Sequence, residues 1–191
     1  MRRALSIVSL RRRASRAKPL NVVLGCGDTR FKGWFGTDQH ILDVRAEQDW
    51  AALFREDSID RLLAEHLFEH LSEDDCAISF RLCRRYLRPG GRLRVAVPDG
   101  YRLDPKYIAD VAPPSDGHQV LFQIDLLGSH LVEAGFRIEP LEYFDANGEF
   151  HTRQWNPADG YVMRSSRFDR SERFLTDALG YTSLIVDAIK E

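Results

Sequence analysis

The segment LNVVLGCG, residues 20–27, is a short apolar run that ends in two glycines on either side of a cysteine. Its β-branched residues, stopped by glycine, predict a buried strand followed by a tight turn. Glycine lets backbone amides approach a ligand with no side chain in between. In a sheet of parallel strands, ligands bind beyond the carboxyl ends of the strands. The segment therefore predicts a ligand-binding turn after the first strand.

Strand and helix patterns alternate downstream of this turn. Strands are expected at residues 34–38, 40–44, 59–64, 92–97, 136–144 and 182–190, and helices at residues 46–57, 72–87 and 120–134. Ser72 is the expected N-cap of the second helix, and Gly135 stops the third. Residues 100–118 are rich in Pro, Gly and Asp and are expected to form a loop. This alternation predicts an α/β fold with a mostly parallel sheet covered by helices on both faces.

The overall composition restricts the class of protein. The chain has 191 residues, 43% of them hydrophobic and 29% charged, which fits one domain with a sizeable core. No stretch approaches the roughly 18 to 20 apolar residues of a membrane span. Three cysteines cannot form a closed set of disulfides, and no Cys-x-x-Cys pair occurs. A reducing compartment is the simplest interpretation, so we expect a cytoplasmic protein.

The first 18 residues differ from the rest of the chain. They contain seven Lys or Arg residues and no acid, although the whole chain carries a net charge of −2. A basic segment on an acidic body argues against a broad nucleic-acid surface. We therefore expect residues 1–18 to be a solvated helix that docks on a single domain, residues 19–191. A mitochondrial transit peptide has a similar composition and is the alternative for this segment.

The spacing around the glycine turn indicates which ligand it suits. A dinucleotide-binding fingerprint needs a third glycine where this chain has Arg30, and its acid follows roughly 20 residues on. Here an acid, Asp38, comes at the end of the second expected strand, much sooner after the turn. Asp38 is placed to accept hydrogen bonds from a ribose diol, and Asp43 lies where an adenine edge would be. The pattern suits a nucleoside without a pyrophosphate.

Six segments occur in the order found in a known family. They are LNVVLGCG, FGTD, IDRLLAEHLFEHL, CRRYLRPGGRLRVAVPD, LVEAGF and YTSLIVDAIK, from about Leu20 to the C-terminus. Together they resemble a class I S-adenosylmethionine-dependent methyltransferase, and in particular the small methyltransferases related to the type 11 group. The resemblance implies a Rossmann-like sheet with an antiparallel last strand, the cofactor S-adenosylmethionine and transfer of its methyl group. It does not identify the methyl acceptor.

The resemblance also implies roles for particular residues. Gly25, Cys26 and Gly27 correspond to the turn that cradles the cofactor. Asp38 corresponds to the acid that binds the ribose. The remaining cofactor positions contact the adenine or lie beside the methionine part, and they are Asp43, Val44, Ala64 and Glu65. Two positions depart from the family pattern, because Val23 stands where an acid is usual and Thr29 replaces a frequent glycine. The ammonium group of the cofactor is then left to backbone carbonyls or to another acid.

Catalytic and acceptor-binding residues are predicted by their location alone. His66, Asp99 and His118 are the candidates for a base, which a hydroxyl acceptor would require. Residues 144–161 are longer than a connection between two antiparallel strands needs, and they contain His151 and Trp155. Long loops in compact domains are often functional. We therefore predict that His151 and Trp155 contribute to the wall of the acceptor pocket, with a structural flap as the alternative.

Two other functions compete with methyl transfer. The pentapeptide HLFEH, residues 66–70, matches the inverted zinc-peptidase pattern, which needs both histidines on one face of a helix. Its predicted position between a strand and a helix disfavours that function, so no metal is expected. The missing acid at Val23 leaves a non-catalytic S-adenosylmethionine binder as the second alternative. A small or sugar-containing acceptor is favoured over nucleic acid, and the oligomeric state is not readable from the sequence.

Overall fold

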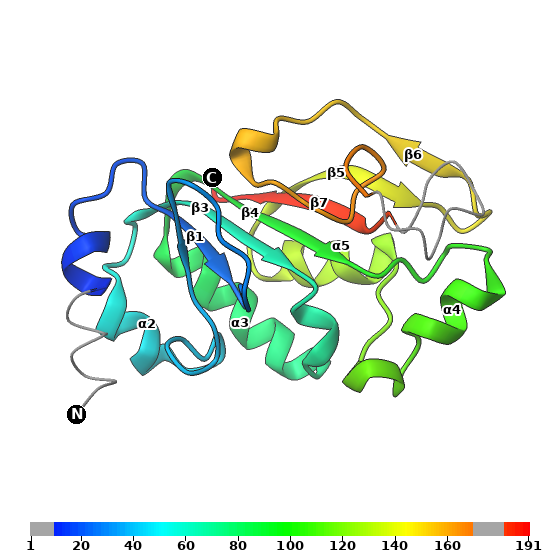
Figure 1. The fold of residues 1–191 in the computed structure, drawn as a ribbon, viewed down its shortest axis with the longest axis horizontal. Coiled ribbons are helices and arrows are strands. Elements are labelled where there is room, and N and C mark those ends of the chain that lie inside the picture. Colours follow the sequence, from blue (N-terminus) through cyan, green and yellow to red (C-terminus); the bar gives the residue numbers. More distant parts are fainter. Residues whose placement is uncertain (1–9, 170–181) are drawn as a thin grey trace.

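The computed structural model describes residues 10–169 and 182–191, which form a seven-stranded mixed sheet in the order β2-β1-β3-β4-β7-β5-β6 (Figure 1). The strands are β1 (Asn21–Leu24), β2 (Trp34–Gly36), β3 (Ile59–Glu65), β4 (Leu87–Val97), β5 (Arg137–Phe144), β6 (Phe150–Thr152) and β7 (Leu184–Ile189). The α-helices are α2 (Glu47–Leu53), α3 (Glu73–Tyr86), α4 (Pro105–Val111) and α5 (Ile124–Glu133). Short 3-10 helices are η1 (Phe68–His70), η2 (Ser115–Gly117) and η3 (Pro157–Asp159).

The sheet has the predicted Rossmann-like character. Strands β2, β1, β3 and β4 run parallel, and the last strand β7 is antiparallel to both of its neighbours, β4 and β5. All residues of β1 and β7 are buried, because both faces of the central strands are covered. Apolar runs rather than alternating patterns are typical of such doubly covered strands. The predicted mostly parallel sheet with an antiparallel last strand is confirmed.

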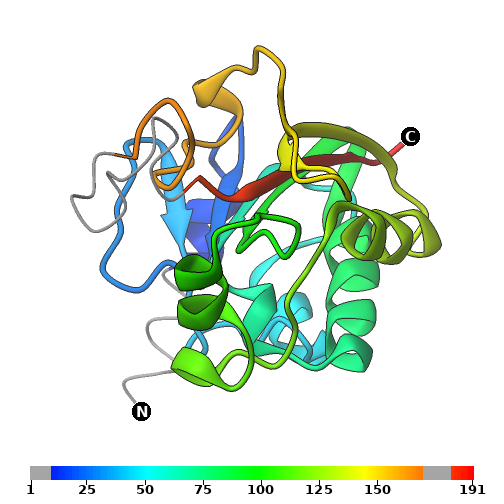
Figure 2. The same cartoon turned by 90° about the vertical axis from the view of Figure 1, so that its right-hand side faces the viewer.

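The two faces of the sheet are covered differently. Alternate residues of a strand point to opposite faces, and Val22 and Leu24 of β1 pack in the larger core under α2, α3 and α5. Val23 packs in a smaller core on the other face. Residues 153–169 cover that face, and they contain η3 instead of an α-helix (Figures 1 and 2). Within the described residues, the α-helical cover of the sheet thus lies on one face, whereas we expected it on both.

The expected strand at residues 40–44 is wrong. These residues form turns, because the Asp38 carboxylate accepts a hydrogen bond from the His40 amide at 3.0 Å. The Asp38 carbonyl oxygen also accepts from the amides of Ile41 (2.9 Å) and Leu42 (2.8 Å). An aspartate that bonds to the backbone two residues ahead competes with strand pairing. Strand β2 is therefore followed by turns that lead to α2.

The expected loop at residues 100–118 contains a helix that we did not predict. The carboxylate of Asp104 caps α4 by accepting from the amides of Lys106 (2.9 Å) and Tyr107 (3.1 Å), and Pro105 follows at the first helical position. Aspartate as N-cap followed by proline is a recognised start signal for a helix. The sequence contained this signal. The other two helix boundaries that we named are confirmed, with Ser72 capping α3 and Gly135 following α5 at φ +91°.

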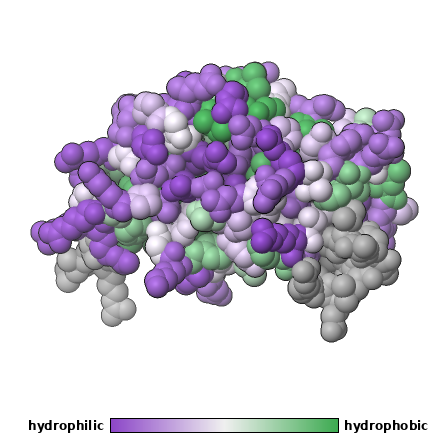
Figure 3. Space-filling model, turned by 90° about the horizontal axis from the view of Figure 1, so that it is seen from above, coloured by the Kyte–Doolittle hydropathy of each residue, from purple (hydrophilic) through white to green (hydrophobic). Residues whose placement is uncertain are grey.

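A hairpin extends the sheet at its edge. Asn147 and Gly148 form a turn, in which the Asp145 carboxylate accepts hydrogen bonds from the amides of Asn147 (2.9 Å) and Glu149 (3.0 Å). The returning residues form β6, which pairs antiparallel with β5. Seen from the side of residues 153–169, the surface is mainly hydrophilic (Figure 3). The long connection between β5 and β7 therefore begins as an ordered part of the sheet.

The described part of the basic segment lies on the domain. Residues 10–14 are helical, and Ala14 is buried in the larger core. The Arg13 guanidinium lies 5.4 Å from the centre of the Phe35 ring. Residues 1–9 lie outside the described residues, so the division of the chain at residue 18 stays a prediction. Among the described residues, no helix is both long and apolar enough to cross a membrane.

Candidate functional site

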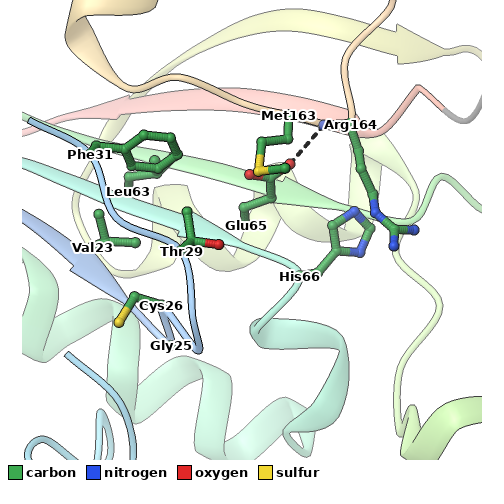
Figure 4. A pocket seen from close by; sticks show the side chains of 10 residues that line it. All are labelled: Val23, Gly25, Cys26, Thr29, Phe31, Leu63, Glu65, His66, Met163 and Arg164. Atoms are coloured by element: carbon green, nitrogen blue, oxygen red, sulfur yellow. Dashed lines mark hydrogen bonds between the residues drawn. The ribbon is translucent and has the colours of Figure 1, made fainter. Parts of the chain in front are cut away.

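A cavity of about 260 Å³ lies at the carboxyl ends of β1 and β3 (Figure 4). Its lining consists of Val23, Gly25, Cys26, Thr29, Phe31, Leu63, Glu65, His66, Met163 and Arg164. Val23 pairs with Leu63 in the parallel register of these strands. Glu65 follows two residues after Leu63, and residues two apart share one face of a strand. The cavity therefore opens on the sheet face that residues 153–169 cover.

The glycine turn forms one end of the cavity. Gly25 and Gly27 have φ values of +61° and +48°, a region that glycine enters without steric cost. A Cβ atom on Gly25 would lie 3.0 Å from Leu67 Cδ1, so this glycine is needed for packing. A Cβ atom on Gly27 would meet nothing within 4 Å. The space beside the Gly27 Cα is therefore open to a ligand.

Cys26, between the two glycines, holds the turn against β2. Its amide donates a hydrogen bond to the Thr37 carbonyl at 2.8 Å. A Cβ atom on Gly36 would lie 2.7 Å from the Cys26 Sγ, so the thiol occupies the space beside that glycine. Burial raises the pKa of the Cys26 thiol, which disfavours the thiolate. Cys26 packs the turn rather than acting as a nucleophile.

An arginine stands where the first helix of the resembled family would begin. Residues 28–33 contain neither helix nor strand, and the Arg30 guanidinium Nη1 donates to the carbonyl oxygens of Gly27 (2.8 Å) and Thr29 (2.7 Å). These bonds satisfy carbonyl groups that no helix covers. The turn is thus closed by a side chain, which leaves a positive charge beside it.

The two predicted acids after β2 have different surroundings. One oxygen of Asp38, Oδ1, accepts from the His40 amide, and within the described residues its Oδ2 makes no hydrogen bond. Both oxygens of Asp43 accept from Arg45, at 2.9 and 2.8 Å. These hydrogen bonds hold the pKa of Asp43 below its usual value. The backbone carbonyl of Val44 accepts from the Trp50 indole at 3.0 Å. Asp38 is available to a ligand, whereas Asp43 and Val44 are engaged within the protein.

Glu65 and His66 end β3 at the cavity. Glu65 is the acid among the residues that line it, and its Oε1 accepts from the Arg164 amide at 2.8 Å. His66 has a positive φ of +54°, which is uncommon for a residue with a side chain and is often found at functional sites. Its Nδ1 lies 2.8 Å from Glu69 Oε1 and its Nε2 lies 3.1 Å from Ser183 Oγ. Neighbouring Ala64 is fully buried and lines no part of the cavity.

The segment that covers the cavity is tied to the sheet. The carbonyl oxygen of Arg164 accepts from the Ser183 amide at 2.9 Å. Glu142, buried on β5, accepts through Oε2 from the Ser166 amide (2.7 Å) and the Thr182 hydroxyl (2.9 Å). Because these contacts join residues far apart in the chain, the cover depends on the folded sheet.

Two of the three predicted catalytic residues lie outside this cavity. Asp99 is buried and accepts from the amides of Tyr101 (3.0 Å) and Phe144 (2.8 Å). Burial raises the pKa of Asp99 to about 6. His118 is also buried, and its Nδ1 lies 2.6 Å from the Val111 carbonyl oxygen. Of the three candidates for a base, His66 is the one that lines the cavity.

The predicted acceptor residues make other contacts. The Trp155 indole donates to Glu142 Oε1 at 2.8 Å, and the Arg94 guanidinium lies 4.7 Å from its ring centre. His151 Nε2 lies 2.8 Å from Asp145 Oδ2, and its ring stacks on Tyr143. Neither side chain lines the cavity. Such contacts within the protein favour the alternative that we gave, in which this loop is a structural flap. A role of His151 and Trp155 in acceptor binding stays a prediction.

Sequence reasoning missed the apolar walls of the cavity, which are Phe31, Leu63 and Met163, and the cover residue Arg164. Leu63 carried a signal, because it lies two residues before Glu65 in a predicted strand. Phe31 and Met163 carried none, since each lies in an irregular segment that only the tertiary structure brings to the cavity.

The segment HLFEH does not form one helix. His66 ends the β3 region with a left-handed backbone, and only Phe68, Glu69 and His70 form the 3-10 helix η1. The two histidines therefore do not share a helical face, which the inverted zinc-peptidase pattern requires. That alternative is not supported.

Comparison with known proteins found matches to solved structures, but none to a family model or a curated sequence. No protein-family model and none of the curated proteins searched matches the sequence. A methyltransferase dependent on S-adenosylmethionine from Archaeoglobus fulgidus is 18% identical, with a TM-score of 0.53 over 98% of this chain and 94% of that one. A possible histamine N-methyltransferase from Thermotoga maritima is 13% identical, with a TM-score of 0.54 over 99% and 91% of the two chains.

A third structure was solved with ligands bound. It is the 1,6-didemethyltoxoflavin-N1-methyltransferase of Burkholderia thailandensis, with 1,6-didemethyltoxoflavin and S-adenosylhomocysteine. It is 16% identical to this chain, with a TM-score of 0.51 over 97% of this chain and 78% of that one. Identities this low establish the fold and no more. The chain has the fold of the S-adenosylmethionine-dependent methyltransferases.

Proposed function

We propose that the protein transfers a methyl group from S-adenosylmethionine to a small-molecule or sugar-containing acceptor. The proposal is carried by one observation: in this fold, a cavity lies beside the glycine turn at the carboxyl ends of β1 and β3. Ligands of open α/β sheets bind at such ends. Nucleic acid is disfavoured as the acceptor by the acidic balance of the body of the chain.

The glycine turn, the end of β2 and the cavity each offer one group that fits this cofactor. Gly27 presents open backbone, and Asp38 has an oxygen that is free within the described residues and suits a ribose hydroxyl. Glu65 supplies the acid that is missing at Val23, because both side chains line the same cavity. A carboxylate there would pair with the cofactor's α-ammonium group. Asp43 and Val44 fit less well, since their polar groups are already engaged.

For methyl transfer, the main task of the protein is to position the two reactants. The cofactor, when bound, supplies an electrophilic methyl group, and the protein holds donor and acceptor in line. Glu69 and Ser183 hold the His66 ring on both of its nitrogens. His66 is therefore oriented at the cavity wall, where it is the candidate base for a hydroxyl acceptor.

A non-catalytic S-adenosylmethionine binder is the second candidate. The observation that favours it is Val23, which stands where an acid is usual in the resembled family. Release of labelled methyl groups to products, measured with panels of small amines, phenols and sugars, separates the two. Tight binding of S-adenosylhomocysteine with no turnover on any panel would favour the binder.

Asp38→Ala is expected to weaken binding of S-adenosylhomocysteine by about 1.5 to 3 kcal/mol, the range for a hydrogen bond to a charged group. The variant removes the carboxylate proposed to hold the ribose. Titration calorimetry measures the change. Gln39→Ala, which alters an exposed neighbour, is the matched control and should bind as the parent does. Undetectable binding by a well-folded parent contradicts the proposed function itself.

Glu65→Gln is expected to weaken binding of S-adenosylhomocysteine by a similar amount, about 1.5 to 3 kcal/mol, because the ammonium group loses its charged partner. Binding of 5′-methylthioadenosine, which lacks the amino-acid part, should stay at the parent level. Asp38→Ala should weaken both ligands, since both contain the ribose. Equal losses for the two ligands in Glu65→Gln would show that Glu65 acts on the shape of the cavity and not on the ammonium group.

A further inference from the structure

We propose that Glu69, His70 and His118 form a binding site for a divalent transition-metal ion, with zinc as the best match. Each of these residues offers one ligand atom, and all three atoms lie within 4.8 Å of one another. None of the three lines the cofactor cavity. The site is new with respect to the proposed methyl transfer, and it differs from the HLFEH pattern because its third ligand is His118 and not His66.

Backbone hydrogen bonds bring the two parts of the site together. His118 follows η2, about fifty residues after η1 in the sequence. The Glu69 carbonyl oxygen accepts from the amides of Gln119 (2.7 Å) and Val120 (3.2 Å). The Gln119 side chain also donates to the His70 carbonyl at 2.7 Å. These three bonds fix the loop that carries His118 against the helix that carries the other two ligands.

Glu69 is the observation that points to a ligand. Its side chain is 0% exposed, and one oxygen, Oε1, contacts His66 Nδ1 at 2.8 Å. The other oxygen, Oε2, is buried, and no group in the described part of the chain forms a hydrogen bond with it. A buried carboxylate oxygen without a partner is costly, because burial removes it from water without compensation. A cation at Oε2 would compensate for that loss.

The two histidines are arranged as metal ligands usually are. His118 is 7% exposed, and its Nδ1 lies 2.6 Å from the Val111 carbonyl, so Nδ1 carries the proton and Nε2 keeps its lone pair. A carbonyl that holds one ring nitrogen is the common outer partner of a metal-bound histidine. The rings of His70 and His118 meet edge to face with centres 4.8 Å apart. Within the described residues, the His70 ring nitrogens make no hydrogen bond.

The donor set indicates the metal. Two imidazoles and one carboxylate are the ligands of several zinc sites with an open fourth position, and imidazole also suits iron, nickel and copper. Hard ions such as Mg²⁺ and Ca²⁺ prefer oxygen ligands. Two ligands at zinc–ligand distances of about 2.0 to 2.2 Å stand at most about 4.4 Å apart, which is close to the 4.8 Å within which the three atoms lie. A cation at this position would also compensate the buried carboxylate of Glu69 for the loss of water.

Glu69 connects the proposed metal site to the cofactor cavity. Glu69 contacts the proposed ion through one oxygen and His66, which lines the cavity, through the other. A bound ion would therefore hold Glu69 and, through it, the orientation of His66. His66 is a positioning partner here and not a metal ligand.

Zinc titration of the full-length protein, freed of metal by a chelator, tests the proposal without any cofactor. We expect one zinc ion per chain by calorimetry, and Co²⁺ should give the visible absorbance of a tetrahedral site. Loss of an outer partner of a metal ligand lowers affinity about 10- to 100-fold, so losing a ligand itself should cost at least about 100-fold. His118→Ala and the isosteric Glu69→Gln are the variants, each checked for folding by circular dichroism.

His151→Ala is the matched control, because Asp145, Glu149 and His151 are the other described group with metal-ligand character. Zinc affinity should be unchanged in this variant. A folded parent that binds no zinc overturns the proposal, as does binding that survives in His118→Ala or disappears in His151→Ala. Preference for Mg²⁺ over zinc overturns the choice of metal. None of these results depends on S-adenosylmethionine, so they stand apart from the test of methyl transfer.

Discussion

Asp187→Asn is expected to lower the free energy of unfolding by about 3 to 5 kcal/mol, the cost of breaking a buried ion pair by removing one partner. Asp187 on β7 and Arg94 on β4 are both fully buried and face each other across the antiparallel pair. Arg94 donates to both carboxylate oxygens, at 2.7 and 2.8 Å. The asparagine cannot balance the guanidinium charge, which stays buried.

The same guanidinium also holds the segment over the second face of the sheet. It donates to the carbonyl oxygens of Asn156 (3.0 Å) and Gly160 (2.6 Å). Urea unfolding followed by tryptophan fluorescence measures the loss. Asp57→Asn is the matched control, since the Asp57 side chain that pairs with Lys190 is 59% exposed, and exposed pairs contribute about 0 to 1 kcal/mol. Equal losses in the two variants would contradict the role assigned to burial.

Thr29→Trp is expected to abolish detectable binding of S-adenosylhomocysteine. Thr29 is half-buried and its side chain points into the cavity (Figure 4), whose volume of about 260 Å³ leaves no room for both an indole and the ligand. A loss of 1,000-fold corresponds to about 4 kcal/mol, at 1.4 kcal/mol for each factor of ten. Calorimetry measures the affinity.

Asp28→Trp is the control for this variant. It places the same side chain on the adjacent, exposed residue of the same turn. Its affinity should stay within a few-fold of the parent, and both variants should unfold near the parent midpoint because residues 28–33 lie outside the regular elements. Parent-like binding in Thr29→Trp would place the cofactor elsewhere on the molecule.

Much of the fold was predictable, because local patterns and tertiary packing agree in the central strands. The apolar runs of β1, β3 and β4 are buried, and glycine or proline marks the ends of β1 and β4. The missed helix α4 carried a readable signal in Asp104 and Pro105. The wrong strand at residues 40–44 shows the opposite case, in which a hydrogen bond from the His40 amide to the Asp38 carboxylate prevails over an apolar pattern.

The candidate site was predictable where it lies on regular structure. Gly25, Cys26 and Glu65 line the cavity. The strand pattern predicted the glycine turn, and the resemblance to the methyltransferases implied the position of Glu65. Asp99 and His118 were grouped with His66 as possible bases, yet the structure places both outside the cavity. Their positions depend on loops whose paths are set by contacts between distant residues, such as the Asp99 carboxylate with the Phe144 amide at 2.8 Å.

The sequence by itself determined the order of the elements and the glycine turn, since these follow from hydrophobic periodicity and from where glycine and proline interrupt it. The antiparallel last strand was implied by the resemblance to the methyltransferases. Only the tertiary structure decided which face of the sheet holds the cavity, and that Met163 and Arg164 cover it. It alone brought His118 to Glu69 and His70. The physical reason is that backbone propensity acts over a few residues, whereas burial and hydrogen bonding of polar groups are satisfied by partners far along the chain.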